Sequence, residues 1–402
     1  YGIMVWDDFW LNSHPNLPDD LFAFNRNAVE KIKRLRNHPS IAVWCGDNEG
    51  VPLAQLNEWL REDVRTFDGG DRWYQPISRE YGFSGSGPWT NAHPIWYFTA
   101  YPSGFGEHKL DGWGFRTEIG TAVFTNYESY RKFMPDPDRW PMSQEMLDKH
   151  FFGRSSFNSR PDRYFATVEY NYGKASGTED FCRKAQLINY DSHRAMLEAW
   201  NSRMWNSASG VLLWMSHPAW PSLEWQTYSW DFETHGSFYG CRKACEKLHV
   251  QANPHDGQVL VVNTTRNDCR RARVVVSRYT FDGKRLDGLS ENVAVIAANG
   301  VTPVTVLQPL PGDPCHLLRL ELFVEGKRVS VNDYLRSADR NFTALNGVAA
   351  PEPKARLLES HDEAGSRCVR VAVANTASTS AGTAQFNIRQ AEGGEDVLAA
   401  YI

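Results

Sequence analysis

The chain has 402 residues, a net charge of −5 at pH 7 and 15 tryptophans. This charge, together with the lack of a long basic run, argues against a nucleic-acid or polyanion partner, so a neutral ligand fits better. No apolar stretch is long enough to span a membrane, and the seven cysteines lack zinc-ligand spacing, so we expect no metal and no cofactor.

Helices and short apolar strands alternate in the first half of the chain. Apolar residues recur at helical spacing over residues 21–36, after the helix start at residues 18–20, and again over residues 52–67 and 180–205. The run of residues 41–44 is apolar without alternation, which is typical of a parallel strand covered on both faces.

This strand leads into an acidic, hydrogen-bonding tip. Gly46 frees the backbone just before Asn48 and Glu49. In a β/α barrel the C-terminal ends of the strands carry the chemistry, so Glu49 is a candidate catalytic acid. The alternative is a solvated glutamate that opens the next helix. Asp47 beside it adds a carboxylate that favours a cationic ligand or caps that helix.

A second carboxylate, Glu118, stands in another short, glycine-punctuated run, residues 112–120. Glu107 and Asp111 compete with it, but they lie in a Gly-rich polar stretch that is typical of a loop. Arg116 precedes Glu118 by two residues, so it points to the same side of a strand and can keep Glu118 charged. The alternative for Arg116 is a salt bridge unrelated to any ligand.

Residues 210–225 read as a strand followed by a Trp-Pro-Ser turn. Trp214 at the strand end and Trp220 in the turn offer rigid apolar faces against which a ligand can stack. The alternative for both side chains is packing in the core.

All tryptophans fall between Trp6 and Trp230, which indicates two kinds of domain. The later part alternates apolar and polar residues and is rich in Thr, Val and turn residues, as in a β-sandwich. We therefore predict a multidomain chain, α/β followed by all-β. Its expected parts are residues 1–250, a sandwich over residues 251–338, and a linker with the truncated start of a second sandwich over residues 339–402.

The motifs around the two glutamates resemble glycoside hydrolase family 2, in particular its β-mannosidase and exo-β-glucosaminidase branch. The His-Pro-Ser-Ile segment at residues 38–41, leading into Asn48-Glu49, is similar to the family's acid/base segment, and the run around Glu118 is similar to its nucleophile motif. The resemblance implies a (β/α)8 TIM barrel followed by immunoglobulin-like β-sandwich domains. Residues 1–10 resemble the third barrel strand, so a missing N-terminal segment of the same polypeptide is expected to supply the first two.

The resemblance also implies an enzyme, a retaining glycosidase with two glutamates. Glu118 is expected to attack the anomeric carbon while Glu49 protonates the leaving oxygen and then activates water. Burial and the neighbouring nucleophile should raise the pKa of Glu49, whereas Glu118 should stay ionised. Asn48 is expected to hydrogen-bond the 2-substituent of the sugar, or else to form a structural turn.

Further sugar contacts are expected at the strand ends. Asp7, Asn12 and His14 lie at or just past the end of the third strand, where the family often binds sugar, and Tyr97 or Tyr101 is a candidate partner of the nucleophile. A metal at His14 is not expected, because no second ligand stands at the right spacing. The predicted substrate-binding residues are Asn48, Trp214, Trp220, Asp7, Arg116 and Tyr101.

The expected substrate is a glycan with a terminal β-mannoside-like sugar, cleaved by exo action. Glucosaminidase members of the branch tend to have Asp where Glu49 stands, which weakens that alternative without removing it, and another β-linked sugar remains open. A non-catalytic carbohydrate-binding relative is the alternative of another class, against which the two intact glutamates argue. A periplasmic or secreted location follows from the resemblance alone.

Overall fold

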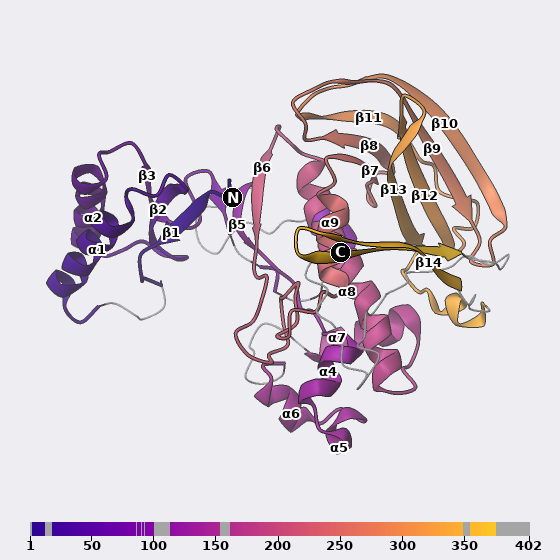
Figure 1. The fold of residues 1–402 in the computed structure, drawn as a ribbon, viewed down its shortest axis with the longest axis horizontal. Coiled ribbons are helices and arrows are strands. Elements are labelled where there is room, and N and C mark those ends of the chain that lie inside the picture. The colour runs from indigo at the N-terminus through magenta and orange to yellow at the C-terminus, as the bar shows by residue number, and fades with distance from the viewer. Residues whose placement is uncertain are drawn as a thin grey trace. The chain divides into compact units, whose positions relative to one another are not determined.

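The computed structural model describes residues 2–12, 18–85, 87–89, 91, 93–99, 113–152, 161–348 and 354–374. The chain divides into two compact units (Figure 1). The first comprises residues 1–88, 100–120 and 203–214, and the second comprises residues 89–99, 121–202 and 215–402. No helix among the described residues is long and apolar enough to cross a membrane.

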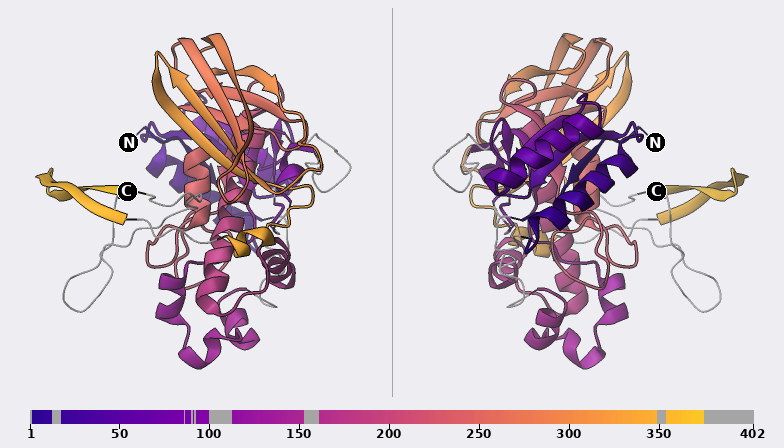
Figure 2. Two further views of the ribbon diagram at one scale, coloured as in Figure 1. Left: turned by 90° about the vertical axis from the view of Figure 1, so that its right-hand side faces the viewer. Right: turned by 90° about the vertical axis from the view of Figure 1, so that its left-hand side faces the viewer.

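The first unit contains a parallel sheet in the order β1-β2-β3. Parallel neighbours require a crossover connection, and α1 and α2 supply these crossovers. The right-hand view of Figure 2 shows both helices side by side. Their bounds are β1 (Val5–Asp8), α1 (Leu21–Leu35), β2 (Ile41–Asp47), α2 (Ala54–Phe67) and β3 (Trp73–Ile77).

Both helices confirm the sequence periodicity. The Asp20 side chain accepts a hydrogen bond from the Ala23 N–H at 2.9 Å, which caps the N-terminus of α1. The apolar stripes of the two helices pack with the sheet around the fully buried Trp44. The strand predicted over residues 41–44 extends to Asp47, because Cys45 and Asp47 continue to pair with β3.

A second parallel sheet in the same unit has the order β4-β5-β6 and carries Glu118. It consists of β4 (Phe83–Ser84), β5 (Gly114–Ile119) and β6 (Ala208–Leu213). Gly210 is needed where β6 crosses Phe115, because a Cβ there would lie 2.7 Å from the ring. The described residues thus form two three-stranded parallel sheets, and the closed barrel implied by the family resemblance stays a prediction.

The second unit combines a helical layer with antiparallel sheets. Its longest helix, α8, spans Thr178–Asn201, close to the predicted 180–205. Gly236 and Gly240 let α9 approach α8 closely, because a Cβ at either position would lie within 2.3 Å of a backbone oxygen of α8. The other helices are α3 (Pro94–Thr99), α4 (Tyr127–Phe133), α5 (Asp136–Arg139), α6 (Gln144–Lys149), α7 (Pro161–Tyr172) and α9 (Gly236–Ala244).

Two antiparallel sheets, ordered β10-β9-β12-β13 and β11-β8-β7, share one apolar core (Figure 1). Inward side chains such as Val261, Val274 and Leu320 come from both sheets, as in a sandwich. The mixed and all-β character predicted from the sequence is therefore present, while the immunoglobulin-like assignment stays a prediction. The strands are β7 (Leu248–Ala252), β8 (Gln258–Asn263), β9 (Cys269–Tyr279), β10 (Arg285–Ile296), β11 (Gly300–Val306), β12 (His316–Val324) and β13 (Lys327–Arg336).

A short 3-10 helix, η1 (Thr343–Gly347), follows the sandwich. The last described element is a hairpin of β14 (Lys354–Glu363) and β15 (Ser366–Ala374). This hairpin lies within residues 339–402, for which the sequence analysis predicts a linker and the start of a second sandwich.

A buried polar cluster joins α8 to β7 and β13 within the second unit. One Glu198 carboxylate oxygen, Oε1, accepts hydrogen bonds from Tyr334 Oη and Asn332 Nδ2, both at 2.8 Å, and lies 3.0 Å from His249 Nε2. Burial opposes the charged form of Glu198, yet the bond to His249 and the charge of Arg194 hold its pKa below the usual value. Burial likewise opposes protonation of His249, but Glu198 and Glu246 raise its pKa.

Replacing His249 with phenylalanine should lower the free energy of unfolding by about 3 kcal/mol, because Glu198 then remains buried without its cationic partner. Urea unfolding at pH 6 measures the loss. His361→Phe, on the exposed hairpin, is the matched control and should change stability by less than about 0.5 kcal/mol. The pKa of His249 is raised by folding, so its contribution is complete below about pH 6.5 and disappears as the pH rises through the folded-state pKa. Equal stability of the His249 variant and the wild type at pH 6 would contradict this account.

Candidate active site

The backbone of Glu49 is clamped between two neighbouring strand ends. Its N–H donates to Ser78 Oγ at 2.8 Å and its carbonyl accepts from Arg79 Nη2 at 2.9 Å, both just past β3. Ser78 Oγ also donates to Asn48 Oδ1 at 3.0 Å, and the Asn48 N–H donates to the Leu11 carbonyl. Glu49 has a φ of 57°, a left-handed conformation that is costly for a residue with a Cβ. Such strain is typical of functional sites, where the surrounding structure enforces it.

Glu118 lies half-buried on β5. Burial, the charge of Glu49 and the charge of Asp8 together raise its pKa to about 7, against the opposing effect of Arg116 and Arg79. The carboxylates of Glu49 and Asp8 therefore both lie within electrostatic reach of the Glu118 carboxyl group. The structure thus brings together the two glutamates that the sequence analysis paired.

The ionisation of Glu118 differs from our expectation. We expected Glu118 to stay charged at neutral pH, whereas a pKa of about 7 leaves it only about half ionised. The reason is that burial and two neighbouring carboxylates outweigh the stabilising charges. Arg116 is one of these charges, but it is only 1% exposed, so its guanidinium acts on Glu118 from within the protein.

Asp7 and Asp8 occupy opposite faces of β1, as successive strand residues do. The Asp7 carboxylate lies 2.5 Å from Lys31 Nζ on α1, so the structure turns this predicted sugar-binding residue toward the helix. Asp8 instead raises the pKa of Glu118 and of Asp47. The sequence analysis did not identify Asp8. The available clue was that successive side chains of a strand alternate between the buried face of the sheet and the opposite face.

Asp47 is 4% exposed, and its Oδ1 has no hydrogen-bond partner among the described residues. Burial and the charge of Asp8 raise its pKa to about 6. The helix-capping alternative for Asp47 is wrong, because α2 begins after Leu53 and no side chain caps it. Asp47 is therefore a buried carboxyl group within electrostatic reach of Asp8, and it remains mostly charged at pH 7.

The two predicted sugar-stacking tryptophans are both exposed, Trp214 by 43% and Trp220 by 46%, which argues against core packing. Trp214 directly follows β6, and its N–H donates to the Ile119 carbonyl at 2.8 Å. The Trp214 backbone is therefore bonded to the residue that directly follows Glu118 in the sequence. Trp220 belongs to the second unit, where its ring stacks on His150 with a centroid separation of 6.2 Å.

The remaining candidates are Tyr97, Tyr101, Asn12 and His14. Tyr101 and His14, together with the competing acids Glu107 and Asp111, lie outside the described residues. Tyr97 is fully buried in α3 of the second unit. Asn12 forms a parallel bridge with Asn48, so it supports the tip that holds Glu49.

Three ligand-type side chains meet on the terminal hairpin. The ligand atoms of His361, Glu363 and Cys368 lie within 4.8 Å of one another. The group shares no residue with the glutamate pair, and side chains of this kind often cluster on exposed surfaces without an ion. We therefore assign no metal to it.

Comparison with known proteins gives the site its context. The chain is 30% identical over 420 residues to mannosylglycoprotein endo-beta-mannosidase from Lilium longiflorum, covering 91% of this chain and 43% of that protein. It is 27% identical to exo-beta-D-glucosaminidase from Streptomyces avermitilis, covering 89% and 40%. The crystal structure of Amycolatopsis orientalis exo-chitosanase shares the fold, with a TM-score of 0.77 at 21% identity over 88% of this chain and 45% of that one. No protein-family model matches.

The fold and the relatives together define the class: the chain is related to glycoside hydrolases that cleave β-linked sugars. Within that class it is related to the β-mannosidase and exo-β-glucosaminidase branch of glycoside hydrolase family 2, which confirms the resemblance found in the sequence. The chain spans less than half the length of the curated relatives it matches.

The effect of the neighbouring carboxylates on the pKa of Glu118 can be tested without a substrate. Asp8→Asn should lower the pKa of Glu118, because it removes a negative charge that now raises it. Asp7→Asn is the matched control and should leave that pKa nearly unchanged, since the Asp7 carboxylate is paired with Lys31. Carbon NMR of glutamate side-chain carboxyls across pH 4 to 9 measures both. An equal effect of the two variants would contradict the assignment of the two faces of β1.

Proposed function

We propose that the protein is a retaining β-glycoside hydrolase that acts by double displacement through Glu49 and Glu118, with exo action on a terminal β-mannoside-like sugar. One observation carries the proposal: the two glutamates lie at the ends of strands in one compact unit and are close enough for one to raise the pKa of the other. Two neighbouring carboxyl groups suit a reaction that needs one acid and one base. The relationship to β-mannosidases supports the choice of sugar.

In the first step, the ionised Glu118 carboxylate attacks the anomeric carbon and forms an ester with the sugar. Glu49 gives its proton to the glycosidic oxygen as the bond to the aglycone breaks. In the second step, Glu49 takes a proton from water, and the resulting hydroxide displaces Glu118. Arg116 and Arg79 favour the charged form of Glu118 that starts the cycle.

The clamp at the end of β2 fits this scheme. Ser78 holds the Glu49 backbone and the Asn48 side chain at once, which fixes the proposed acid relative to the amide. Asn48 would then donate from Nδ2 to the 2-substituent of the sugar, since its Oδ1 is engaged by Ser78. Trp214 would stack on the sugar's C–H face beside Glu118, and Trp220 is retained as a second stacking candidate.

An exo-β-glucosaminidase is the second candidate, favoured by a specific observation. Asp8 adds negative charge near Glu118, and Asp47 lies within electrostatic reach of Asp8. Such a cluster attracts an ammonium group, as a 2-amino sugar would offer, and several relatives are named for that activity. The sugar panel described below separates the two candidates.

We further propose that β1 to β6 belong to one β/α barrel, within a catalytic portion spanning residues 1–250. An immunoglobulin-like sandwich over residues 251–338 follows, and residues 339–402 form a linker and the beginning of another sandwich. The topology of the two parallel sheets and the antiparallel core support this arrangement. A periplasmic or secreted location is proposed from the family relationship alone.

The direct test is hydrolysis by the full-length protein of aryl β-mannoside, glucosaminide, galactoside, glucuronide and glucoside. Glu118→Ala should abolish activity on the preferred sugar, and Glu49→Ala should lower kcat/KM by about 10²- to 10⁴-fold. Glu58→Ala, on the exposed side of α2, is the control and should retain full activity.

Azide distinguishes the roles of the two glutamates. In Glu118→Ala, azide fills the nucleophile's place and should yield an α-glycosyl azide, whereas in Glu49→Ala it replaces water and should yield the β-anomer. The opposite anomers would exchange the two roles. No hydrolysis of any sugar would favour the non-catalytic carbohydrate-binding alternative.

The pH dependence offers a further test. If Glu118 is the nucleophile, it must be ionised, so kcat/KM should rise through an apparent pKa of about 7 on the acidic side. Arg116→Gln should move this rise to higher pH, because Arg116 lowers the pKa of Glu118. A fall in kcat/KM above pH 7 that moves in the same way would instead identify Glu118 as the proton donor.

A further inference from the structure

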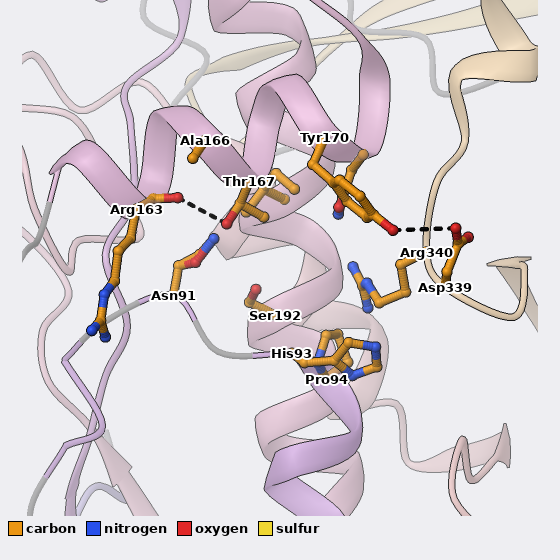
Figure 3. Close-up of a pocket in the computed structure, with 12 residues that line it drawn as sticks. Asn91, His93, Pro94, Arg163, Ala166, Thr167, Tyr170, Ser192, Asp339 and Arg340 are labelled. Atoms are coloured by element: carbon orange, nitrogen blue, oxygen red, sulfur yellow. Dashed lines mark hydrogen bonds between the residues drawn. The ribbon is translucent and has the colours of Figure 1, made fainter.

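The second unit contains a cavity of about 410 Å³ that shares no residue with the proposed catalytic site. Its walls come from the start of α3, from α7, from α8 and from residues 339–340 after β13 (Figure 3). The volume falls in the range of small-molecule sites. Pro94, Ala166 and Ile188 give it an apolar portion, while amide, hydroxyl and guanidinium groups supply the rest.

Two amide side chains in its wall have hydrogen-bonding capacity that the described residues leave unused. Asn171 is 3% exposed, and its Nδ2 donates to no partner there. The Oδ1 of Asn91 is also buried and accepts from no partner there. Ser192, whose side chain faces the cavity in Figure 3, adds a buried hydroxyl. Buried polar groups normally find partners, so this arrangement suits a ligand that both donates and accepts.

Two of the charged side chains around the cavity are engaged by neighbours. The Arg340 guanidinium lies 2.8 Å from a carboxylate oxygen of Asp191, and Asp339 accepts a hydrogen bond from the Tyr170 hydroxyl at 3.1 Å. Arg163 is exposed at the edge of the cavity, beside Asn91 (Figure 3). A bare anion such as sulfate would accept from Asn171 but could not donate to Asn91. A hydroxyl does both.

We propose that this cavity is a second carbohydrate site that binds one neutral pyranose unit. Adjacent sugar hydroxyls would accept from Asn171 Nδ2 and donate to Asn91 Oδ1, while the C–H face of the ring covers Ile188 and Pro94. Only the choice of mannose as the probe rests on the proposed function. The site adds a place to hold a branched or extended glycan without taking part in the chemistry.

The experiment is calorimetric titration of the full-length protein with D-mannose, compared with sodium sulfate. Ala166→Trp fills the cavity from the exposed face of α7, so it should remove one of two mannose-binding events. Glu169→Trp, on an exposed position of the same helix outside the cavity, is the matched control and should keep both. Asn171→Leu should weaken the same event by about tenfold or more.

The outcomes separate this inference from the proposed function. Both tryptophan variants should hydrolyse the preferred aryl glycoside as the wild type does. Unchanged mannose binding in Ala166→Trp, or sulfate binding that this variant abolishes, would overturn the carbohydrate site. Loss of one mannose-binding event in a protein that hydrolyses none of the aryl glycosides would leave the carbohydrate site in place and remove the proposed function.

Discussion

The candidate site depends on the burial of the Glu118 carboxyl group beside two other carboxylates. Burial alone disfavours the charged form, and each negative neighbour adds to that effect. The positive charges of Arg116 and Arg79 partly offset this effect, because they lower the pKa of Glu118. The protonation of Glu118 therefore responds to small changes in its surroundings, which is a property that acid-base catalysis needs.

Parallel topology brings these groups together. β1, β2 and β3 run in the same direction, so Asp8, Asp47, Glu49 and Ser78 all lie at or beyond their C-terminal ends. Glu118 lies on β5 of the separate sheet β4-β5-β6, in the same compact unit. The helices α1 and α2 pack against the first sheet through a shared apolar core.

The sequence was sufficient for features that arise from local periodicity. It predicted α1, α2 and α8 because their apolar residues repeat at helical spacing, and it located both glutamates because each ends a short apolar strand. It selected Asp7 and missed Asp8, since adjacent residues differ only in the face that the folded sheet assigns to them. It also misjudged the ionisation of Glu118, because a pKa depends on burial and on charges distant in sequence. The amides of Asn91 and Asn171 escaped notice for the same reason, as tertiary packing alone brings α3 and α7 to one cavity.

The left-handed backbone of Glu49 has a consequence for the variability of the protein. A conformation with φ of 57° suits glycine, and a side chain there costs on the order of 1 kcal/mol or more. Selection for stability alone would therefore tend to remove the glutamate, whereas selection for function would retain it. Among copies of this gene that have lost their function, this position should be among the first to drift toward glycine, and the fold should gain from the change.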